Sequence, residues 1–202
     1  MKKRPIVLQA REVLALLGGH KTQLRRPYKD VPMLGDISQR SDLTTAWLEK
    51  FGANTLCPIG HAGQRLYVRE TLREGDKMGD WYYAADGTSL ANRRCKELNA
   101  TRQSVPAATM PWWASRLTLK ILKVELQRLH EITGNPSDAA AEMGWEEMTP
   151  GTVDFWRDPS DQSWCRHPDE EFPAWWDAVY GKKTPWASDP WIWAITFERI
   201  KP

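Results

Sequence analysis

The apolar segments of this 202-residue chain are all short, and glycine, proline and charged residues separate them throughout. The longest apolar cluster, residues 13–17, spans about five residues, whereas a membrane-spanning helix needs roughly 20. The basic residues 2–4 precede Gln9, Arg11 and Glu12 rather than a continuous apolar stretch, so no export signal is expected. We therefore expect a chain without membrane partners, whose core is assembled from several short helices and strands.

Several segments have the period-two alternation that is typical of half-buried strands. In residues 65–70, Leu66 and Val68 would face the core. Further strands are expected at residues 6–8, 21–26, 81–84 and 191–197, and the longest strand is expected where residues 110–113 open a β pattern that continues to Leu126.

Helical spacing followed by a glycine stop occurs three times. The three expected helices are residues 11–17 before Gly18-Gly19, residues 136–143 before Gly144 and residues 172–180 before Gly181. A fourth helix is expected at residues 43–51, after a capping aspartate. Because strands and helices alternate irregularly, the pattern favours an α+β fold, with a small, strongly bent or closed sheet decorated by helices, over a parallel α/β sheet.

The length fits one domain, and a chain of this size buries roughly 70% of its unfolded surface without a metal or disulfide staple. We expect a single domain over residues 1–202, with insertions at about 28–56 and 145–171. Residues 1–30 contain eight Lys and Arg against two acids, whereas residues 140–180 contain ten acids against two Arg. The two regions should therefore present opposite electrostatic fields.

The chain has three widely spaced cysteines, Cys57, Cys95 and Cys165, which suit reduced thiols in a cytoplasm better than a disulfide framework. Two of them lie near a histidine, His61 or His167, but neither pair has the spacing of a zinc knuckle. The sequence also lacks a Gly-x-Ser-x-Gly elbow, a phosphate-binding Gly-Lys-Ser/Thr loop and a dinucleotide fingerprint. We expect no metal and no bound cofactor.

The densest cationic site is Lys21, Arg25 and Arg26 beside Thr22, directly after the glycines that end the first helix. Alternation along a strand would place Lys21 and Arg25 on one face, and guanidinium groups match the oxygens of phosphate or carboxylate. The same few residues supply a hydroxyl and backbone N–H groups. A ligand site and a solvated basic face are both compatible with this pattern.

Twelve residues are tryptophan, and indole serves both as core filler and as a surface on which bases stack. The adjacent Trp112 and Trp113 precede Arg116, and in a strand one indole could pack inward while its neighbour lines a groove. Arg69 and Glu70 could form a structural ion pair or, in a cleft, Glu70 could orient the arginine or accept a proton. Core packing is the alternative for each tryptophan.

Residues 19–26, Gly-His-Lys-Thr-Gln-Leu-Arg-Arg, resemble the opening motif of ASCH domains, which are PUA-like β-barrels with a motif close to Gly-Arg-Lys-Thr-x-Thr-x-Arg. Four more segments resemble a phage and prophage subgroup of this family: residues 11–13, 57–70, 110–119 and 190–193. The resemblance implies a small PUA-like (ASCH) β-barrel decorated with short helices and a long insertion. It also implies a cleft that takes RNA, nucleotides or modified nucleosides.

The resemblance further implies roles for particular residues. One bacterial ASCH protein is an amidohydrolase that acts on acetylated cytidine, and RNA cleavage is another activity attributed to the group. In the amidohydrolase, a Lys and a Thr of the motif work with a Glu from a later helix. By position these correspond to Lys21, Leu24 and Glu142, and leucine can neither attack nor donate a proton. The nearby hydroxyl of Thr22 lies in a different strand register, and Thr22 joins Lys21 and Glu142 as a candidate catalytic residue.

Our leading hypothesis is a cytoplasmic protein of a bacterial or phage-infected cell that binds RNA, single-stranded nucleic acid or a nucleotide. The cations after Gly19 and the indoles near residue 112 are expected to border one common hollow. The expected ligand-binding residues are Arg25, Arg26, Arg69, Glu70, Trp112, Trp113 and Arg116. The alternative is a hydrolase acting on a modified nucleoside or on RNA, with Lys21 stabilising negative charge and Glu142 as general base. A third hypothesis is an interaction module whose acidic residues 140–180 bind a basic partner.

Overall fold

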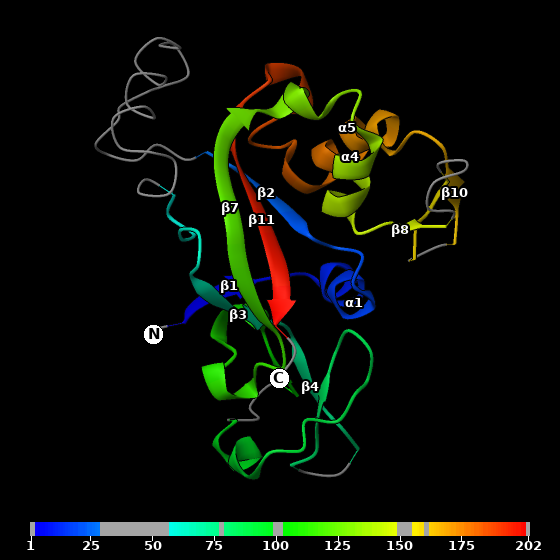
Figure 1. Ribbon diagram of the computed structural model, residues 1–202. Helices are drawn as coiled ribbons and strands as arrows, with labels where there is room; N and C mark the ends of the chain where they lie inside the picture. The colour runs from blue at the N-terminus through cyan, green and yellow to red at the C-terminus, as the bar shows by residue number, and fades with distance from the viewer. Residues whose placement is uncertain are drawn as a thin grey trace.

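The computed structural model describes residues 3–28, 57–76, 79–98, 103–148, 155–159 and 162–200 of the chain. Within these ranges the fold is α+β, with three α-helices and several β-sheets (Figure 1). None of the helices in these ranges is long and apolar enough to cross a membrane.

Five strands form the central sheet, in the order β1-β3-β7-β11-β2. They are β1 (Arg4–Val7), β2 (Gln23–Pro27), β3 (Arg65–Arg69), β7 (Thr118–Arg128) and β11 (Trp191–Ile200). The pair of β1 and β3 is parallel, and the other neighbouring pairs in this sheet are antiparallel. The two longest strands, β7 and β11, are neighbours in the interior of the sheet.

The barrel expected from the resemblance is not confirmed. Among the residues that are described, β1 pairs only with β3 and β2 pairs only with β11, so the central sheet is open and has two edges. The chain passes from β1 to β2 through helix α1 (Ala10–Gly18) rather than through a hairpin, which lets the two strands join opposite edges.

The central core lies between α1 and one face of the sheet. Val13 and Leu16 of α1 are buried in it together with Leu66 and Val68 of β3, as the alternation in the sequence predicts. The helix ends where the sequence predicts, because Gly19 adopts the left-handed conformation with a φ of 87°.

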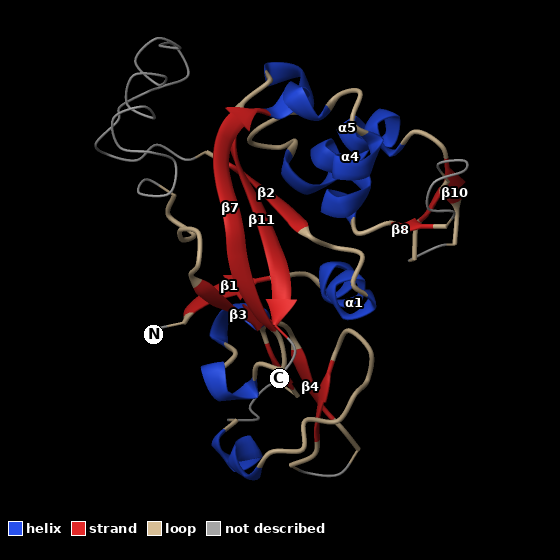
Figure 2. Cartoon of the chain, in the orientation of Figure 1, coloured by secondary structure: helices blue, strands red, loops and turns tan. Residues whose placement is uncertain are grey.

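A second, smaller core lies beyond one end of the central sheet, where Figure 2 shows short helical turns and strands. It is built on a three-stranded sheet of β4 (Leu72–Glu74), β5 (Trp81–Tyr83) and β6 (Ser104–Val105). Short 3-10 turns cover it at Arg93–Glu97, Ala107–Thr109 and Trp112–Ala114.

The long strand whose pattern is expected to open at residues 110–113 begins at Thr118 instead, as β7. Pro111 opens the 3-10 turn, and its carbonyl accepts a hydrogen bond from the Ala114 N–H at 3.1 Å. Ala114 is buried in the second core, so burial of this small side chain favours a turn over a continued strand. The two indoles therefore do not alternate across a strand.

Two helices form a layer beside β2 and β11 at the other end of the central sheet (Figure 1). Helix α4 (Pro136–Met143) matches the sequence prediction, with Gly144 as its left-handed stop at a φ of 81°. Helix α5 (Pro168–Tyr180) begins four residues earlier than predicted, because Pro168 starts the helix and three acids follow in the first turn. Phe172, Trp176 and Ile192 are fully buried in a third core between this layer and the sheet.

The expected insertion at about 28–56 lies outside the described residues except for Tyr28, and so does the helix expected at 43–51. The described parts of 145–171 contain more structure than the expected loop. They form a three-stranded antiparallel sheet of β8 (Glu146–Glu147), β9 (Trp156–Arg157) and β10 (Trp164–Cys165), and they include the first turn of α5.

Arg116 connects the central sheet to the second core. Its guanidinium donates to both carboxylate oxygens of Glu70, at 2.9 and 2.8 Å, and to Asp86 at 2.8 Å. It also lies 4.0 Å from the centre of the Tyr83 ring. This hydrogen bonding to Arg116 lowers the pKa of Asp86 to about 2.

Substitution Arg116→Ala should lower the free energy of unfolding by about 3 kcal/mol, because it leaves the buried Glu70 carboxylate without its cation. Urea denaturation followed by tryptophan fluorescence measures the change. As a control, Lys120→Ala removes an exposed pair with Glu198 and should leave the midpoint almost unchanged. Equal stability of Arg116→Ala and the parent would contradict the connecting role of Arg116.

Candidate functional site

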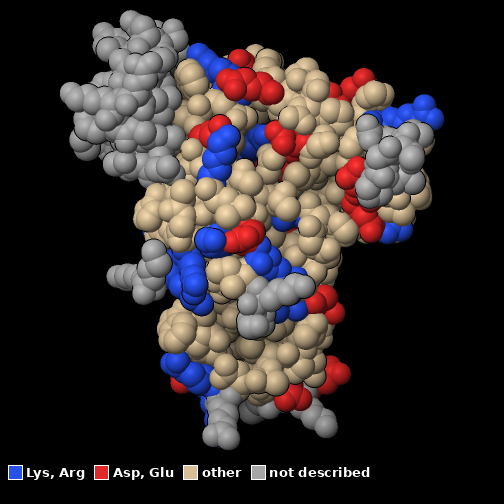
Figure 3. All heavy atoms as spheres, viewed as in Figure 1, with Lys and Arg blue, Asp and Glu red and all other residues tan. Residues whose placement is uncertain are grey.

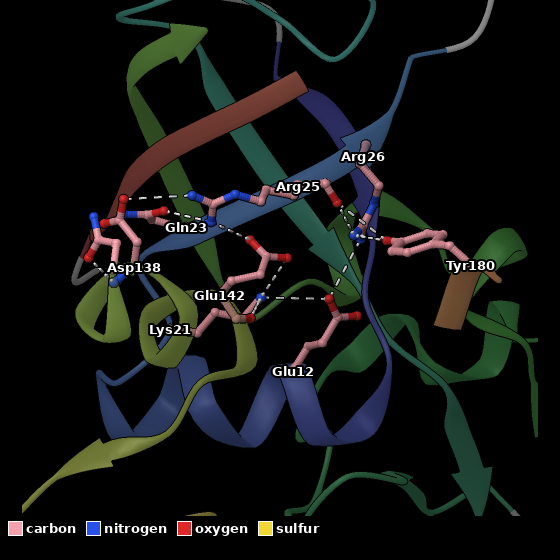
Figure 4. Close-up of polar contacts among 9 residues, drawn as sticks. Glu12, Lys21, Gln23, Arg25, Arg26, Asp138, Glu142 and Tyr180 are labelled. Atoms are coloured by element: carbon pink, nitrogen blue, oxygen red, sulfur yellow. Dashed lines mark hydrogen bonds and ion pairs between the residues drawn. The ribbon is translucent and has the colours of Figure 1, made fainter. Parts of the chain in front are cut away.

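Lys21 lies between α1 and β2, and its side chain has no exposed surface. Its backbone N–H donates to the Ala15 carbonyl at 3.3 Å, which continues the chain reversal after Gly19. Its Nζ donates to the Glu142 backbone carbonyl and lies 3.6 Å from Oε1 of the same residue. A second carboxylate, that of Glu12 on α1, has its Oε1 3.9 Å from Nζ (Figure 4).

Glu142 is the most deeply buried acid of this group, with no exposed surface. Its Oε2 lies 3.7 Å from Nη1 of Arg25, so the carboxylate is held between two cations. Neither of its carboxylate oxygens has a hydrogen-bond partner within the described part of the chain. The carboxylate therefore depends on the charges of Lys21 and Arg25 for its stability in the interior.

A close approach of α4 to α1 fixes Glu142 at this position. A Cβ atom added to Gly144 would lie 2.4 Å from the Cβ of Ala15 and 3.6 Å from that of Lys21. Only glycine fits both this spacing and the positive φ of 81°. The last turn of α4 can therefore bring its carboxylate directly over Lys21.

Arg25 is 2% exposed and joins β2 to the first turn of α4. Its Nη1 donates to Oε1 of Gln23 at 2.8 Å, and its Nη2 lies 3.7 Å from Oδ2 of Asp138. Gln23 in turn donates from Nε2 to Oδ1 of Asp138 at 2.6 Å. These contacts hold the guanidinium in one orientation beside Glu142 (Figure 4).

Arg26 extends the group toward α5. Its Nη2 lies 3.6 Å from Oε1 of Glu12, and its Nη1 donates to the Tyr180 hydroxyl. The Tyr180 hydroxyl donates to the Arg25 carbonyl at 3.4 Å. We call Glu12, Lys21, Arg25, Arg26, Glu142 and Tyr180 the buried polar cluster.

Burial shifts two pKa values in the buried polar cluster. It lowers the pKa of Lys21, although Glu142 and Glu12 act in the opposite direction. It raises the pKa of Tyr180 to about 12, so this hydroxyl keeps its proton at neutral pH. The cluster thus holds a desolvated lysine, a desolvated carboxylate and a neutral phenol, which are groups that can transfer or stabilise protons.

A pocket of about 1010 Å³, which we call the main pocket, borders the cluster at Arg26 and Tyr180. The charged residues on its wall are Arg4, Arg26, Lys182, Lys183 and Asp177. Its aromatic residues are Tyr28, Tyr180 and Trp193. The wall described here therefore combines ring surfaces with four cations and one acid.

The expected common hollow is not formed. Trp112 and Trp113 line a different pocket, of about 400 Å³, together with Lys3, Tyr67, Ser115 and Thr118. None of Lys21, Arg25 and Arg26 lines that pocket. The cations after Gly19 and the indoles near residue 112 are separated because the 3-10 turn holds the indoles beside β3, away from α4 and α5.

The other candidate residues also lie outside the buried polar cluster. Glu70 pairs with Arg116, whereas the guanidinium of Arg69 donates to the Ala108 carbonyl at 2.9 Å. Thr22 is exposed, and its carbonyl accepts from the Phe197 N–H at 3.0 Å. The structure thus brings together Lys21, Glu142, Arg25 and Arg26 and leaves the remaining candidates elsewhere.

Three contributors were not singled out from the sequence: Glu12, Asp138 and Tyr180. Glu12 has one local signal, since it is an acid on the largely apolar helix that precedes the basic motif. Asp138 and Tyr180 lie more than a hundred residues from the cations that they contact, so only the tertiary fold reveals their role. Across the described ranges, no three His, Cys, Asp or Glu side chains are grouped so that they could hold a metal ion.

Comparison with known proteins gives no relative: no family model, no curated protein and no solved structure matches this chain. The resemblance to ASCH domains therefore remains a prediction, and the geometry of the site carries the functional argument.

Substitution Lys21→Met should lower the free energy of unfolding by about 3–5 kcal/mol, because it removes one of the two cations that stabilise Glu142. The double variant Lys21→Met/Glu142→Leu should recover most of that loss, since it removes the buried carboxylate as well. Urea denaturation of the two single variants and the double variant measures this coupling. Additive losses would show that Lys21 and Glu142 do not stabilise each other.

Proposed function

We propose that the main pocket binds a nucleotide or a nucleoside, either free or as part of RNA or another single-stranded nucleic acid. The composition of the wall carries this proposal, because aromatic rings occur there together with four cations and a single acid. A base offers a flat face for Tyr28 or Tyr180, which keep some exposed surface, and a phosphate offers oxygens for the cations. A volume of about 1010 Å³ exceeds what one nucleoside fills, which leaves space for a modified base or a neighbouring phosphate.

The cations divide into two groups. Arg26 already lies 3.6 Å from a Glu12 oxygen and contacts Tyr180, so its charge is largely compensated. Lys182 and Lys183 are exposed and follow directly after α5. We assign the phosphate contacts to these two lysines and to Arg4, and the contacts with the base to the aromatic side of the pocket.

The resemblance to ASCH domains is consistent with this site. In the proposal, the chain is an ASCH-like protein of the phage and prophage subgroup that acts in the cytoplasm, and its five-stranded sheet is the PUA-like sheet. The Lys and Glu that the resemblance aligns, Lys21 and Glu142, are neighbours beside the pocket. This contact between positions 121 residues apart supports the alignment.

Calorimetric titration with cytidine monophosphate and with cytidine tests the pocket. The variant Lys182→Ala/Lys183→Ala should bind the nucleotide roughly tenfold more weakly, because it loses charged hydrogen bonds to the phosphate, and should bind the nucleoside like the parent. Lys123→Ala, an exposed lysine on β7, serves as the matched control. The proposal fails if neither compound binds, or if the double variant distinguishes nucleotide from nucleoside as the parent does.

A second candidate function is hydrolysis of a modified nucleoside or of RNA, and the contact between Lys21 and Glu142 favours it. In amide hydrolysis, Glu142 would accept a proton from water as the water oxygen bonds to the acyl carbon, while Lys21 stabilises the oxyanion. The C–N bond then breaks as Glu142 returns the proton to the leaving amine. We rank binding first, because neither side chain has exposed surface and substrate access requires Arg26 and Tyr180 to move.

Incubation with acetylated cytidine or a short single-stranded RNA, followed by chromatography, decides this second function. The parent should release cytidine or RNA fragments, and Glu142→Gln should lose turnover while it retains nucleotide affinity. Absence of product at high enzyme concentration, or equal turnover by Glu142→Gln, would exclude the Lys21–Glu142 mechanism for these substrates.

A further inference from the structure

A second set of cations and rings lies on one face of β1, β3 and β7, which we call the outer face. The register places Tyr67 beside Pro5 and Thr118, and Arg65 beside Lys120. The alternate residues of β3 and β7 are fully buried in the central core: Leu66, Val68, Leu119 and Ile121. Because side chains alternate along a strand, the first set points away from that core.

Trp112 brings an exposed indole to the outer face. Its side chain is among the most exposed large hydrophobic groups of the described chain, at 67%. Trp112, Trp113 and Tyr67 line the pocket of about 400 Å³, and Lys3 reaches the same pocket and donates to the Thr118 hydroxyl at 3.3 Å. An exposed indole offers a flat aromatic face on which a base can stack.

The outer face is also positively charged. Lys3 and Arg65 have no carboxylate partner within the described residues, and Arg69 stacks 5.5 Å from the Tyr67 ring centre and bonds only to a backbone carbonyl. Lys120 is the exception, because it pairs with Glu198. Figure 3 shows the resulting gathering of Lys and Arg side chains over β1 and β3, beside the N terminus.

The outer face adjoins the main pocket along the edge strand β1. Arg4 and Pro5 line the main pocket, while Tyr67, the neighbour of Pro5 on β3, lines the smaller one. Adjacent strands lie only about 4.8 Å apart. The two pockets therefore flank a single pair of strands, and one extended ligand can contact both.

We infer that the outer face binds single-stranded nucleic acid, with a base stacked on Trp112 and Tyr67 and the backbone phosphates held by Lys3, Arg65 and Arg69. Exposed rings interleaved with unpaired cations fit a single strand, whose base faces are free, better than a duplex, whose bases are already stacked. An acidic peptide would use the cations but leave the rings uncovered. Continuation of the bound nucleic acid into the main pocket rests on the proposed function, whereas its binding to the outer face does not.

Fluorescence anisotropy with a labelled oligouridine of about ten nucleotides, a length within the range of single-strand binding sites, tests the surface. Trp112→Ala should weaken binding roughly 5- to 150-fold, the effect of losing one stacked base. Arg65→Ala should lower the slope of log affinity against log salt by about 0.7, the value for one phosphate of a single strand. Both variants should bind uridine monophosphate in the main pocket like the parent.

Trp164→Ala is the matched control, because Trp164 is also highly exposed, at 59%, but lies on β10. If Trp112→Ala and Arg65→Ala bind the oligonucleotide like the parent, or if the oligonucleotide binds no more tightly than the mononucleotide, the inference is wrong. If oligonucleotide binding depends on Trp112 while the mononucleotide does not bind, the proposed function of the main pocket is wrong, but the inferred binding of nucleic acid at the outer face is supported.

Discussion

The carboxylate of Glu142 sets the condition that the surrounding elements must meet. A buried, charged carboxylate without hydrogen bonds is tolerated only when cations surround it. Lys21, just before β2, and Arg25, on β2, supply these charges, so α4 must pack on β2 in one orientation. Helix α5 packs on α4 in turn, and its last residue, Tyr180, forms part of the wall of the main pocket. The position of the pocket therefore follows from the pairing of these buried charges.

Sequence reasoning predicts local structure best where a residue has a strong backbone preference. The helix stops at Gly19 and Gly144 are correct because both residues adopt a positive φ. The long strand is predicted correctly, but its predicted start is wrong because the pattern of apolar residues ignores Pro111 and the burial of Ala114, which together favour a 3-10 turn.

For the candidate site, too, the sequence predicts some contacts and misses others. The contact of Lys21 with Glu142 is anticipated by motif position, whereas the spacing of charges alone does not indicate it. The common hollow of cations and indoles is wrong, because strand alternation cannot show which end of a sheet a later turn will reach. The role of Tyr180 could not be predicted, because nothing in the sequence around this tyrosine at the end of a helix indicates its contact with the distant Arg26.

The order of strands has a consequence for how the chain folds. Strands β1 and β2 are separated by one short helix in the sequence, yet they occupy opposite edges of the sheet. Strand β2 is joined to the rest of the sheet by β11, the last described strand, which lies between it and β7. During synthesis, the basic motif therefore cannot acquire its native surroundings until residues 191–200 leave the ribosome. Such dependence on contacts between distant parts of the sequence makes folding slow and cooperative rather than stepwise from the N terminus.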